Sequence, residues 1–181
     1  MLIPLWNSLV RPLMMRPLRF QVAALCYRLG EGGGMGEEAR DGTAGAAAVG
    51  PEVLLITSRE TRRWVLPKGW PKRGHDAGGT ALEEAWEEAG IKAEGPPCSV
   101  GFYDYDKRLD GGLPMPTRVE VFAIPVSRLL DDYPEKGQRE RIWVPAAQAA
   151  TLVDEPQLST LLAGFPRHPL IAAPAARGRP R

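Results

Sequence analysis

"GWPKRGHDAGGTALEEAWEEAGI", residues 69–91, places Glu84, Glu87 and Glu88 near the end of one expected helix. We predict this helix over about residues 78–89, because apolar side chains recur there at helical spacing. The stripe that they form consists of Leu82, Ala85, Trp86 and Ala89. It predicts the core face of the helix, with Trp86 as its anchor. Gly90 is well placed as the residue that ends the helix.

The glutamates Glu84, Glu87 and Glu88 are three and four residues apart, so they are neighbours on a second face of the helix. In the last turn the helix dipole disfavours each anion by about 0.3–1 kcal/mol. Like charges at this spacing add a few tenths of a kcal/mol. A solvated acidic face is the simpler interpretation, but both rules oppose it here. A divalent cation reverses both penalties, and carboxylates at this spacing suit Mg²⁺ or Mn²⁺.

The composition is that of one ordinary soluble domain. The chain has 181 residues, of which 44% are hydrophobic and 25% are charged, which is enough for one sizeable core. The net charge of +1 gives no general attraction to nucleic acid, so no nucleic-acid partner is expected. The two cysteines, Cys26 and Cys98, form no CxxC pair. This favours free thiols in a reducing, cytoplasmic setting.

The ends and one internal segment differ from the rest, which leaves a single domain over residues 18–165. Residues 1–17 are expected to form an N-terminal extension. Their apolar runs are far shorter than the roughly 20 residues that a membrane span needs, so peripheral contact is the remaining membrane alternative. Residues 30–51 are Gly- and Ala-rich without periodicity, which predicts a flexible insertion in a surface loop. Residues 166–181 are expected to be a disordered Pro/Ala/Arg tail.

Within the domain, apolar runs of strand length are interleaved with helical segments. The expected strands are 21–29, 52–59, 62–67, 98–109, 117–126 and 141–145, and two further helices are expected at 146–153 and 156–165. Interleaved strands and helices in one core predict an α/β or α+β fold, with a mixed sheet between helices.

Residues 69–91 resemble the Nudix box, the signature G-x5-E-x7-R-E-U-x-E-E-x-G-U of the Nudix hydrolases, in which U is a bulky apolar residue. Gly69 matches the first glycine, the three glutamates match the E-U-x-E-E segment, and Gly90 and Ile91 match the end. His75 stands where the signature has a glutamate, and Glu83 where it has an arginine. The resemblance implies an α/β/α sandwich.

The two departures have local interpretations. In the family the arginine pairs with a box carboxylate and holds it in position, which Glu83 cannot do. Thr80-Ala-Leu-Glu83 instead has the pattern of a capping box, in which Glu83 bonds back to the helix start. His75 is expected to be a surface residue of the loop. Asp76, one residue later, is a candidate loop acceptor or N-cap.

The resemblance implies hydrolysis of a phosphoanhydride with Mg²⁺, or Mn²⁺, as the cofactor. It implies Glu84 and Glu88 as metal ligands, with a backbone carbonyl near Lys68 or Gly69 as a further ligand. It makes Glu87 the leading general base. Because all three carboxylates are expected to converge on one small volume, the sequence does not decide which of them accepts the proton.

Basic residues near the box predict a highly anionic small-molecule substrate. Lys68, Lys72 and Arg73 lie in the box loop, where solubilising loop charges are the alternative interpretation. "LCYR", "EVLLITSRETRRWVLP" and "RERIWV" resemble the diphosphoinositol polyphosphate phosphohydrolases, which also cleave diadenosine polyphosphates. That resemblance implies phosphate contacts by four further residues, namely Arg19, Ser58, Arg59 and Arg141. "LPKGW", by contrast, is closer to the dinucleoside tetraphosphate hydrolases.

Two other functions stay open. One is a Nudix enzyme for another nucleotide, such as a nucleotide sugar or a nucleoside triphosphate, for which Trp70, Phe102 and Tyr103 are the stacking candidates. The other is a non-catalytic binding module, because the box arginine and the first box glutamate are replaced. No apolar surface helix demands a dimer, so the chain is expected to be a monomer or a homodimer.

Overall fold

The computed structural model describes residues 17–29, 50–107 and 114–172. Nearly all of the expected N-terminal extension, most of the 30–51 insertion and the last nine residues of the tail therefore lie outside the described residues. Within the described ranges, no helix combines the length and the apolar character needed to cross a membrane.

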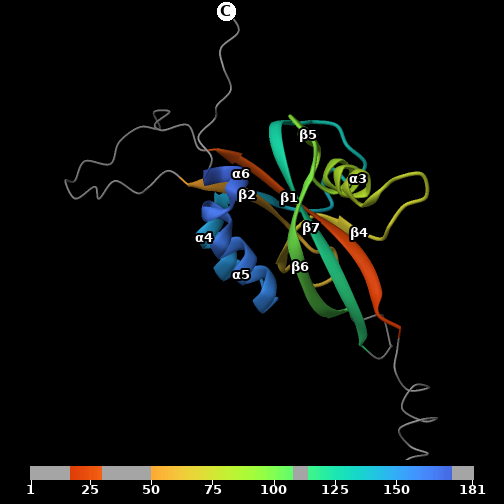
Figure 1. Cartoon of the computed structure of the whole chain (residues 1–181). Coiled ribbons are helices and arrows are strands. Elements are labelled where there is room, and N and C mark those ends of the chain that lie inside the picture. Colours follow the sequence, from red (N-terminus) through yellow and green to blue (C-terminus); the bar gives the residue numbers. More distant parts are fainter. Residues whose placement is uncertain (1–16, 30–49, 108–113, 173–181) are drawn as a thin grey trace, which may run out of the picture.

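The centre of the molecule is a mixed sheet (Figure 1). Its strands are β1 (Arg19–Leu29), β2 (Pro51–Thr57), β3 (Trp64–Val65), β4 (Lys68–Gly69), β5 (Ile91–Ala93), β6 (Cys98–Lys107), β7 (Met115–Leu129) and β8 (Arg141–Pro145). The order is β3-β2-β1-β7-β5, with β4 paired to β1, β6 to β7 and β8 to β2. The central strands β1 and β7 run parallel, and the other pairs are antiparallel.

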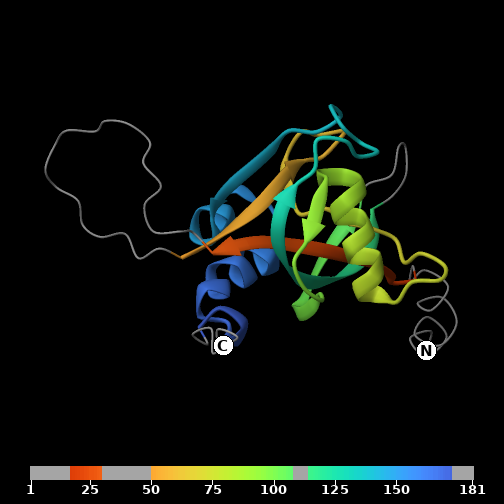
Figure 2. The same ribbon diagram turned by 90° about the horizontal axis from the view of Figure 1, so that it is seen from above.

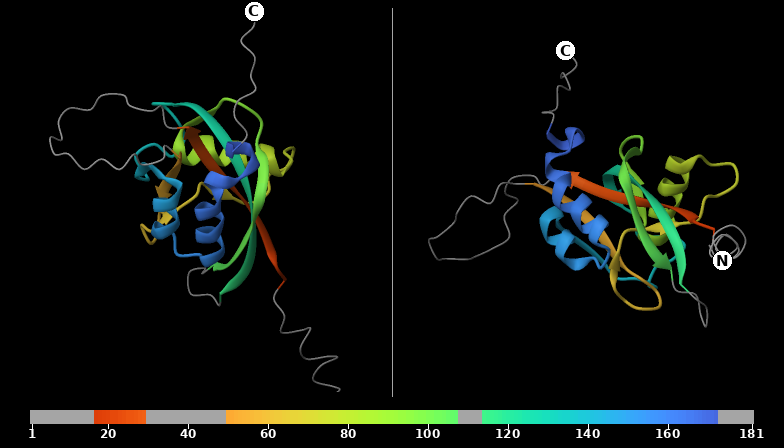
Figure 3. Two further views of the ribbon diagram at one scale, coloured as in Figure 1. Left: turned by 60° about the vertical axis from the view of Figure 1, so that its left-hand side comes forward. Right: turned by 60° about the horizontal axis from the view of Figure 1, so that its bottom comes forward.

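Helices cover both faces of this sheet. They are α3 (Ala77–Ala89), α4 (Ala146–Leu152), α5 (Pro156–Gly164) and the short α6 (Pro169–Ala172), with a 3-10 turn at Phe165–Arg167. Figures 1 and 2 show α3 on one side of the sheet and α4 and α5 on the other. The two views in Figure 3 show the same separation. The predicted α/β class and its sandwich of helix, mixed sheet and helix are confirmed.

Alternation along β1 explains why helices are needed on both sides. Val22, Ala24 and Cys26 pack in the core beneath α3, whereas Ala23 and Leu25 pack in the core beneath α4 and α5. All five side chains are buried. A strand that is buried on both faces reads as a continuous apolar run, which is how this stretch appears in the sequence.

The core face of α3 differs from the predicted one. Ala81, Ala85 and Ala89 are fully buried, whereas Trp86, the expected anchor, is 41% exposed. The prediction for Trp86 was wrong because it placed the most hydrophobic side chain of the stripe against the sheet and did not consider its size. Alanines let the helix backbone approach the sheet closely. The helix is thereby rotated so that Glu84 and Glu88 also lie in its buried arc.

The start of α3 also differs. Asp76 is the N-cap, and its Oδ1 accepts the Gly79 N–H at 2.6 Å. Thr80 lies inside the helix and donates its hydroxyl to the Asp76 carbonyl at 3.0 Å. The expected capping box between Thr80 and Glu83 is therefore wrong, and the alternative role of Asp76 is confirmed. Gly90 follows the helix with φ of 64°, as a C-terminal glycine should.

Ordered structure extends past residue 165. Residues 166–172, which we expected in the tail, form the 3-10 turn and α6. Phe165 anchors this end because its buried ring packs edge-on against Tyr27, with ring centroids 5.3 Å apart. The two- and three-residue strands β4 and β5 were not predicted, because they are too short to show a pattern.

Candidate active site

A cleft of about 750 Å³ lies beside the C-terminal half of α3. Its walls come from β1, β4, β6, the segment after β2, the segment before β8 and the start of α5. The lining residues are Gln21, Ser58, Arg59, Glu60, Thr61, Arg63, Lys68, Glu88, Asp104, Tyr105, Asp106, Lys107, Arg139, Asp154, Glu155 and Pro156.

Glu88 is the box glutamate that lines this cleft. Its Oε2 accepts the backbone N–H of Lys68 at 3.0 Å, and its Oε1 accepts an N–H of the Arg139 guanidinium. Burial raises the pKa of the Glu88 carboxyl to about 7, although the guanidinium opposes this shift. A cation at this carboxylate would therefore decide whether it is ionised near neutral pH.

Glu84 and Glu87 lie around the ammonium group of Lys72. The Lys72 Nζ is 2.6 Å from Oε2 of Glu87 and 3.2 Å from Oε1 of Glu84. Burial raises the pKa of Glu84. The two carboxylates thus already converge on one cation, which the chain itself supplies from the loop before α3.

Gly69 lies directly against Glu84. A Cβ added at Gly69 would be 2.2 Å from the Glu84 carboxyl carbon, so no other residue fits there while Glu84 keeps its place. Gly69 is therefore required by the close approach of the Glu84 carboxyl group to β4.

The two departures from the signature contact each other. His75 Nε2 and Glu83 Oε2 are 3.6 Å apart, and Glu83 Oε2 is also 3.5 Å from Lys72 Nζ. His75 is exposed, as expected. The Glu83 carboxylate therefore faces the loop before α3, where it lies near the Lys72 ammonium group and the His75 ring.

The donor set suits Mg²⁺ in its chemistry, since it consists of hard carboxylate oxygens, two of which lie within 3.2 Å of the Lys72 ammonium group. The side chains are not yet arranged for it. Among residues 17–29, 50–107 and 114–172, no three acidic, histidine or cysteine side chains stand close enough to hold an ion. The predicted convergence of all three glutamates is thus only partly present. Lys72 holds Glu84 and Glu87, while Arg139 holds Glu88.

Three of the basic or polar residues predicted to bind substrate line the cleft, namely Ser58, Arg59 and Lys68. The Ser58 hydroxyl is 2.7 Å from that of Thr61. Arg59 is 62% exposed and 3.4 Å from Oε1 of Glu135. Burial lowers the pKa of Lys68 to about 8. Of the three, Lys68 lies next to Glu88, whose Oε2 accepts its backbone N–H.

The other four predicted substrate contacts lie elsewhere. Arg19 and Arg73 are exposed outside the cleft lining, and Lys72 is held by the box glutamates. Arg141 donates to the Ala89 carbonyl at 2.8 Å and lies over the Tyr133 ring, 4.9 Å from its centroid. Its guanidinium therefore provides a hydrogen-bond donor for a backbone carbonyl in the last turn of α3.

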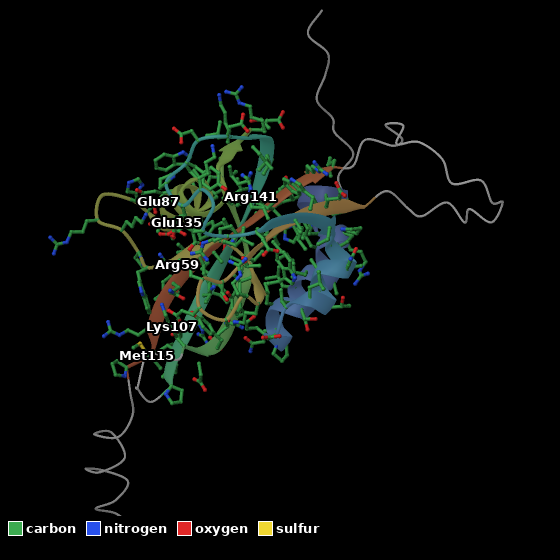
Figure 4. The ribbon with its side chains drawn as sticks, turned by 180° about the vertical axis from the view of Figure 1, so that it is seen from behind. Arg59, Glu87, Lys107, Met115, Glu135 and Arg141 are labelled. Atoms are coloured by element: carbon green, nitrogen blue, oxygen red, sulfur yellow. The ribbon has the colours of Figure 1, made fainter. Side chains whose placement is uncertain are left out.

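The segment between β7 and β8 also contributes to the site, which the sequence did not predict. Its Glu135 donates a backbone N–H to the Glu87 carbonyl at 3.0 Å, which ties the segment to α3. Figure 4 shows Glu87, Glu135 and Arg59 together on one side of the molecule. Arg139 extends from this segment to Glu88. The dense charge run "EKGQRER" marks this segment in the sequence, and of its residues only Arg141 is predicted to contact substrate.

The aromatic residues predicted for base stacking do not line the cleft. Tyr103 is buried, Phe102 is exposed, and the Trp70 ring lies against Lys107, whose Nζ is 4.9 Å from the ring centroid. Tyr105 is the one aromatic residue among the described lining residues. Its hydroxyl donates to Gln21 Oε1 at 2.6 Å.

No protein-family sequence model matches the chain. It is 31% identical over 102 residues to human diphosphoinositol polyphosphate phosphohydrolase 3-beta, which covers 54% of this chain and 57% of that protein. It is 30% identical over 109 residues to Nudix hydrolase 12, mitochondrial, from Arabidopsis thaliana, with 56% and 51% covered. The chain thus spans little more than half the length of these relatives.

The fold is similar to that of an Ap4A hydrolase from C. elegans, solved as a binary complex. The TM-score is 0.55 at 20% sequence identity, over 82% of this chain and 95% of that one. These likenesses confirm, in sequence and in fold, the resemblance of this chain to the Nudix hydrolases.

Proposed function

We propose that this chain is a Mg²⁺-dependent hydrolase that cleaves a phosphoanhydride bond in a highly anionic polyphosphate. The observation that carries the proposal is the shared cleft of Glu88, Arg59 and Lys68, which places a box carboxylate beside cationic groups. Phosphoryl transfer depends mainly on positioning and on neutralising charge, and this arrangement provides for both.

The residues take the roles that the Nudix signature implies. Glu84 and Glu88 would hold Mg²⁺, with a backbone carbonyl at Lys68 or Gly69. When bound, Mg²⁺ supplies charge neutralisation at the phosphate oxygens and activation of water. Glu87 is the leading general base, because its carboxylate is the most exposed of the three and reaches solvent. Arg59 and Lys68 would orient the phosphates.

The lining of the cleft favours a polyphosphate over a substrate held mainly by base stacking. The lining is mainly charged, with one described aromatic residue. Its cationic side chains are Arg59, Arg63, Lys68, Lys107 and Arg139, and its acidic ones are Glu60, Glu88, Asp104, Asp106, Asp154 and Glu155. Arg59, which is 62% exposed, is the cationic group most open to a phosphate. The names of the relatives point to the same class, since one is a diphosphoinositol polyphosphate phosphohydrolase and a structural neighbour is an Ap4A hydrolase. Diphosphoinositol polyphosphates and diadenosine polyphosphates are therefore the two leading substrates.

The test is hydrolysis of a diphosphoinositol polyphosphate, diadenosine tetra- and hexaphosphate, ADP-ribose and a nucleoside triphosphate, with Mg²⁺ or with EDTA, followed by separation of substrate and products on an anion-exchange column. We expect Mg²⁺-dependent turnover of the first three and a loss of at least about 100-fold in Glu87→Gln. The exposed Glu94 provides the matched control, Glu94→Gln, which should keep full activity. Turnover of ADP-ribose or the triphosphate alone would favour another nucleotide, and turnover of none would contradict the proposal.

A further inference from the structure

The carboxylate of Glu88 is oriented by two donors on different elements. The backbone N–H of Lys68 on β4 holds Oε2 at 3.0 Å, and the guanidinium of Arg139 holds Oε1. The Glu88 side chain is only 10% exposed. An ionised carboxylate at such a position needs a nearby cation, because burial of an unpaired charge is costly.

Helix α3 does not supply that cation. Its last turn contains no basic residue. Position 83, where the Nudix signature has arginine, holds Glu83, and this side chain faces Lys72 and His75. The positive charge at Glu88 therefore comes from outside the signature.

The Arg139 guanidinium is held in one orientation by three hydrogen-bond partners. Besides Glu88, its Nε donates to Oε2 of Glu135 at 2.7 Å, and its Nη1 donates to the Thr57 carbonyl at 3.1 Å. Its side chain is 6% exposed. The planar guanidinium has its donors in a rigid fork, so three partners on α3, on β2 and before β8 fix its orientation. That orientation in turn fixes Glu88.

We propose that Arg139 is a positioning residue for Glu88 and thereby sets the geometry of the metal site. The inference rests on the proposed role of Glu88 as a Mg²⁺ ligand. The two requirements are compatible, because each carboxylate oxygen has two lone pairs and can accept a hydrogen bond while it binds an ion. Arg139 also borders the cleft, so its action through Glu88 must be separated from direct contact with substrate.

A double-mutant cycle on Mn²⁺ binding makes that separation without using activity. Mn²⁺ affinity is measured by electron paramagnetic resonance for wild type, Arg139→Ala, Glu88→Gln and the double variant. Residues that orient a metal ligand are typically worth 10–100-fold in affinity. We expect a loss of about that size for Arg139→Ala in wild type, and a loss below about threefold in the Glu88→Gln background. Arg28→Ala, which removes an exposed ion pair with Glu52, is the control.

Arg139→Lys guards against a variant that fails to fold, because it keeps the charge but loses the fork. We expect its Mn²⁺ affinity to lie between those of wild type and Glu88→Gln. Affinity unchanged in a folded Arg139 variant, or an equal loss in both backgrounds, would overturn the inference. Wild type that binds Mn²⁺ but hydrolyses nothing would contradict the proposed function alone, whereas wild type that binds no Mn²⁺ would contradict both.

Discussion

The ammonium group of Lys72 lies 2.6 Å from the carboxylate of Glu87. The same group is 3.2 Å from Glu84. This explains how α3 tolerates so much negative charge in its last turns, where the helix dipole disfavours it. The chain provides an internal counter-ion where the sequence predicts a metal. Because the ammonium contacts two carboxylates at once, it would compete with a metal for the position between them.

Replacing Lys72 with methionine should therefore tighten Mg²⁺ binding. A partly exposed ion pair contributes on the order of 1 kcal/mol, so we expect an affinity gain of about fivefold by titration calorimetry. Lys92→Met, at an exposed position on β5, is the matched control and should not change the affinity. Unchanged or weaker Mg²⁺ binding in Lys72→Met would mean that the ammonium does not compete with the ion.

Gly69→Ala should disturb the site from the other side of the same carboxylate. The added methyl group would sit 2.2 Å from the Glu84 carboxyl carbon, so Glu84 must move. We expect Mg²⁺ affinity to fall by about tenfold or more, which is the usual cost of misplacing a ligand. Gly95→Ala is the control, since its methyl group would meet Pro125 at an ordinary 3.4 Å. Wild-type affinity in Gly69→Ala would argue against Glu84 as a ligand.

The buried Glu88 should make the stability of the metal-free protein depend on pH. Its pKa is raised from 4.5 to about 7, so the folded state holds the proton more tightly than the unfolded state does. The free energy of unfolding should therefore fall as pH rises from about 4.5 to about 7. Urea denaturation across this range should show a steeper fall for wild type than for Glu88→Gln. Parallel curves for the two proteins would contradict the raised pKa.

The sequence was informative wherever one element carried the whole signal. The two-sided burial of β1 and the glutamate face of α3 are local patterns, and both are present in the structure. Even there, periodicity identified a helix face without deciding which of two adjacent arcs is buried. The sequence pattern does not decide whether Trp86 or Ala81 faces the sheet. Packing of the helix against the sheet decides it, and Ala81 is the buried one.

The site itself depends on pairings between distant segments. Arg139 reaches Glu88 and Thr57 because β8 pairs with β2, which places residues more than 80 positions apart in one wall. No spacing rule connects such residues. Arg141 is only two residues from Arg139, but it donates to the Ala89 carbonyl at the end of α3 and does not line the cleft. Sequence spacing alone could not separate the roles of these two arginines.

The two cysteines should differ sharply in reactivity. Cys26 is fully buried in the core beneath α3, and burial raises the pKa of its thiol, whereas Cys98 is exposed. A thiolate-specific reagent should label one thiol in the native protein and two in denaturant. Cys98→Ser should abolish the native labelling. Two reactive thiols under native conditions would mean that α3 opens readily. The cytoplasmic setting inferred from these cysteines stays a prediction.

The exposed Trp86 provides the sharpest check on how α3 is oriented. A buried tryptophan at a helix–sheet contact costs about 3–5 kcal/mol when truncated to alanine, but one that is 41% exposed should cost about 1 kcal/mol or less. Leu25→Ala, in the fully buried centre of β1, should cost about 2–5 kcal/mol and serves as the reference. Chemical denaturation of both variants makes the comparison. A Trp86→Ala cost equal to that of Leu25→Ala would mean that the tryptophan faces the sheet, and such a rotation of α3 would also carry Glu84 and Glu88 away from Gly69 and Arg139.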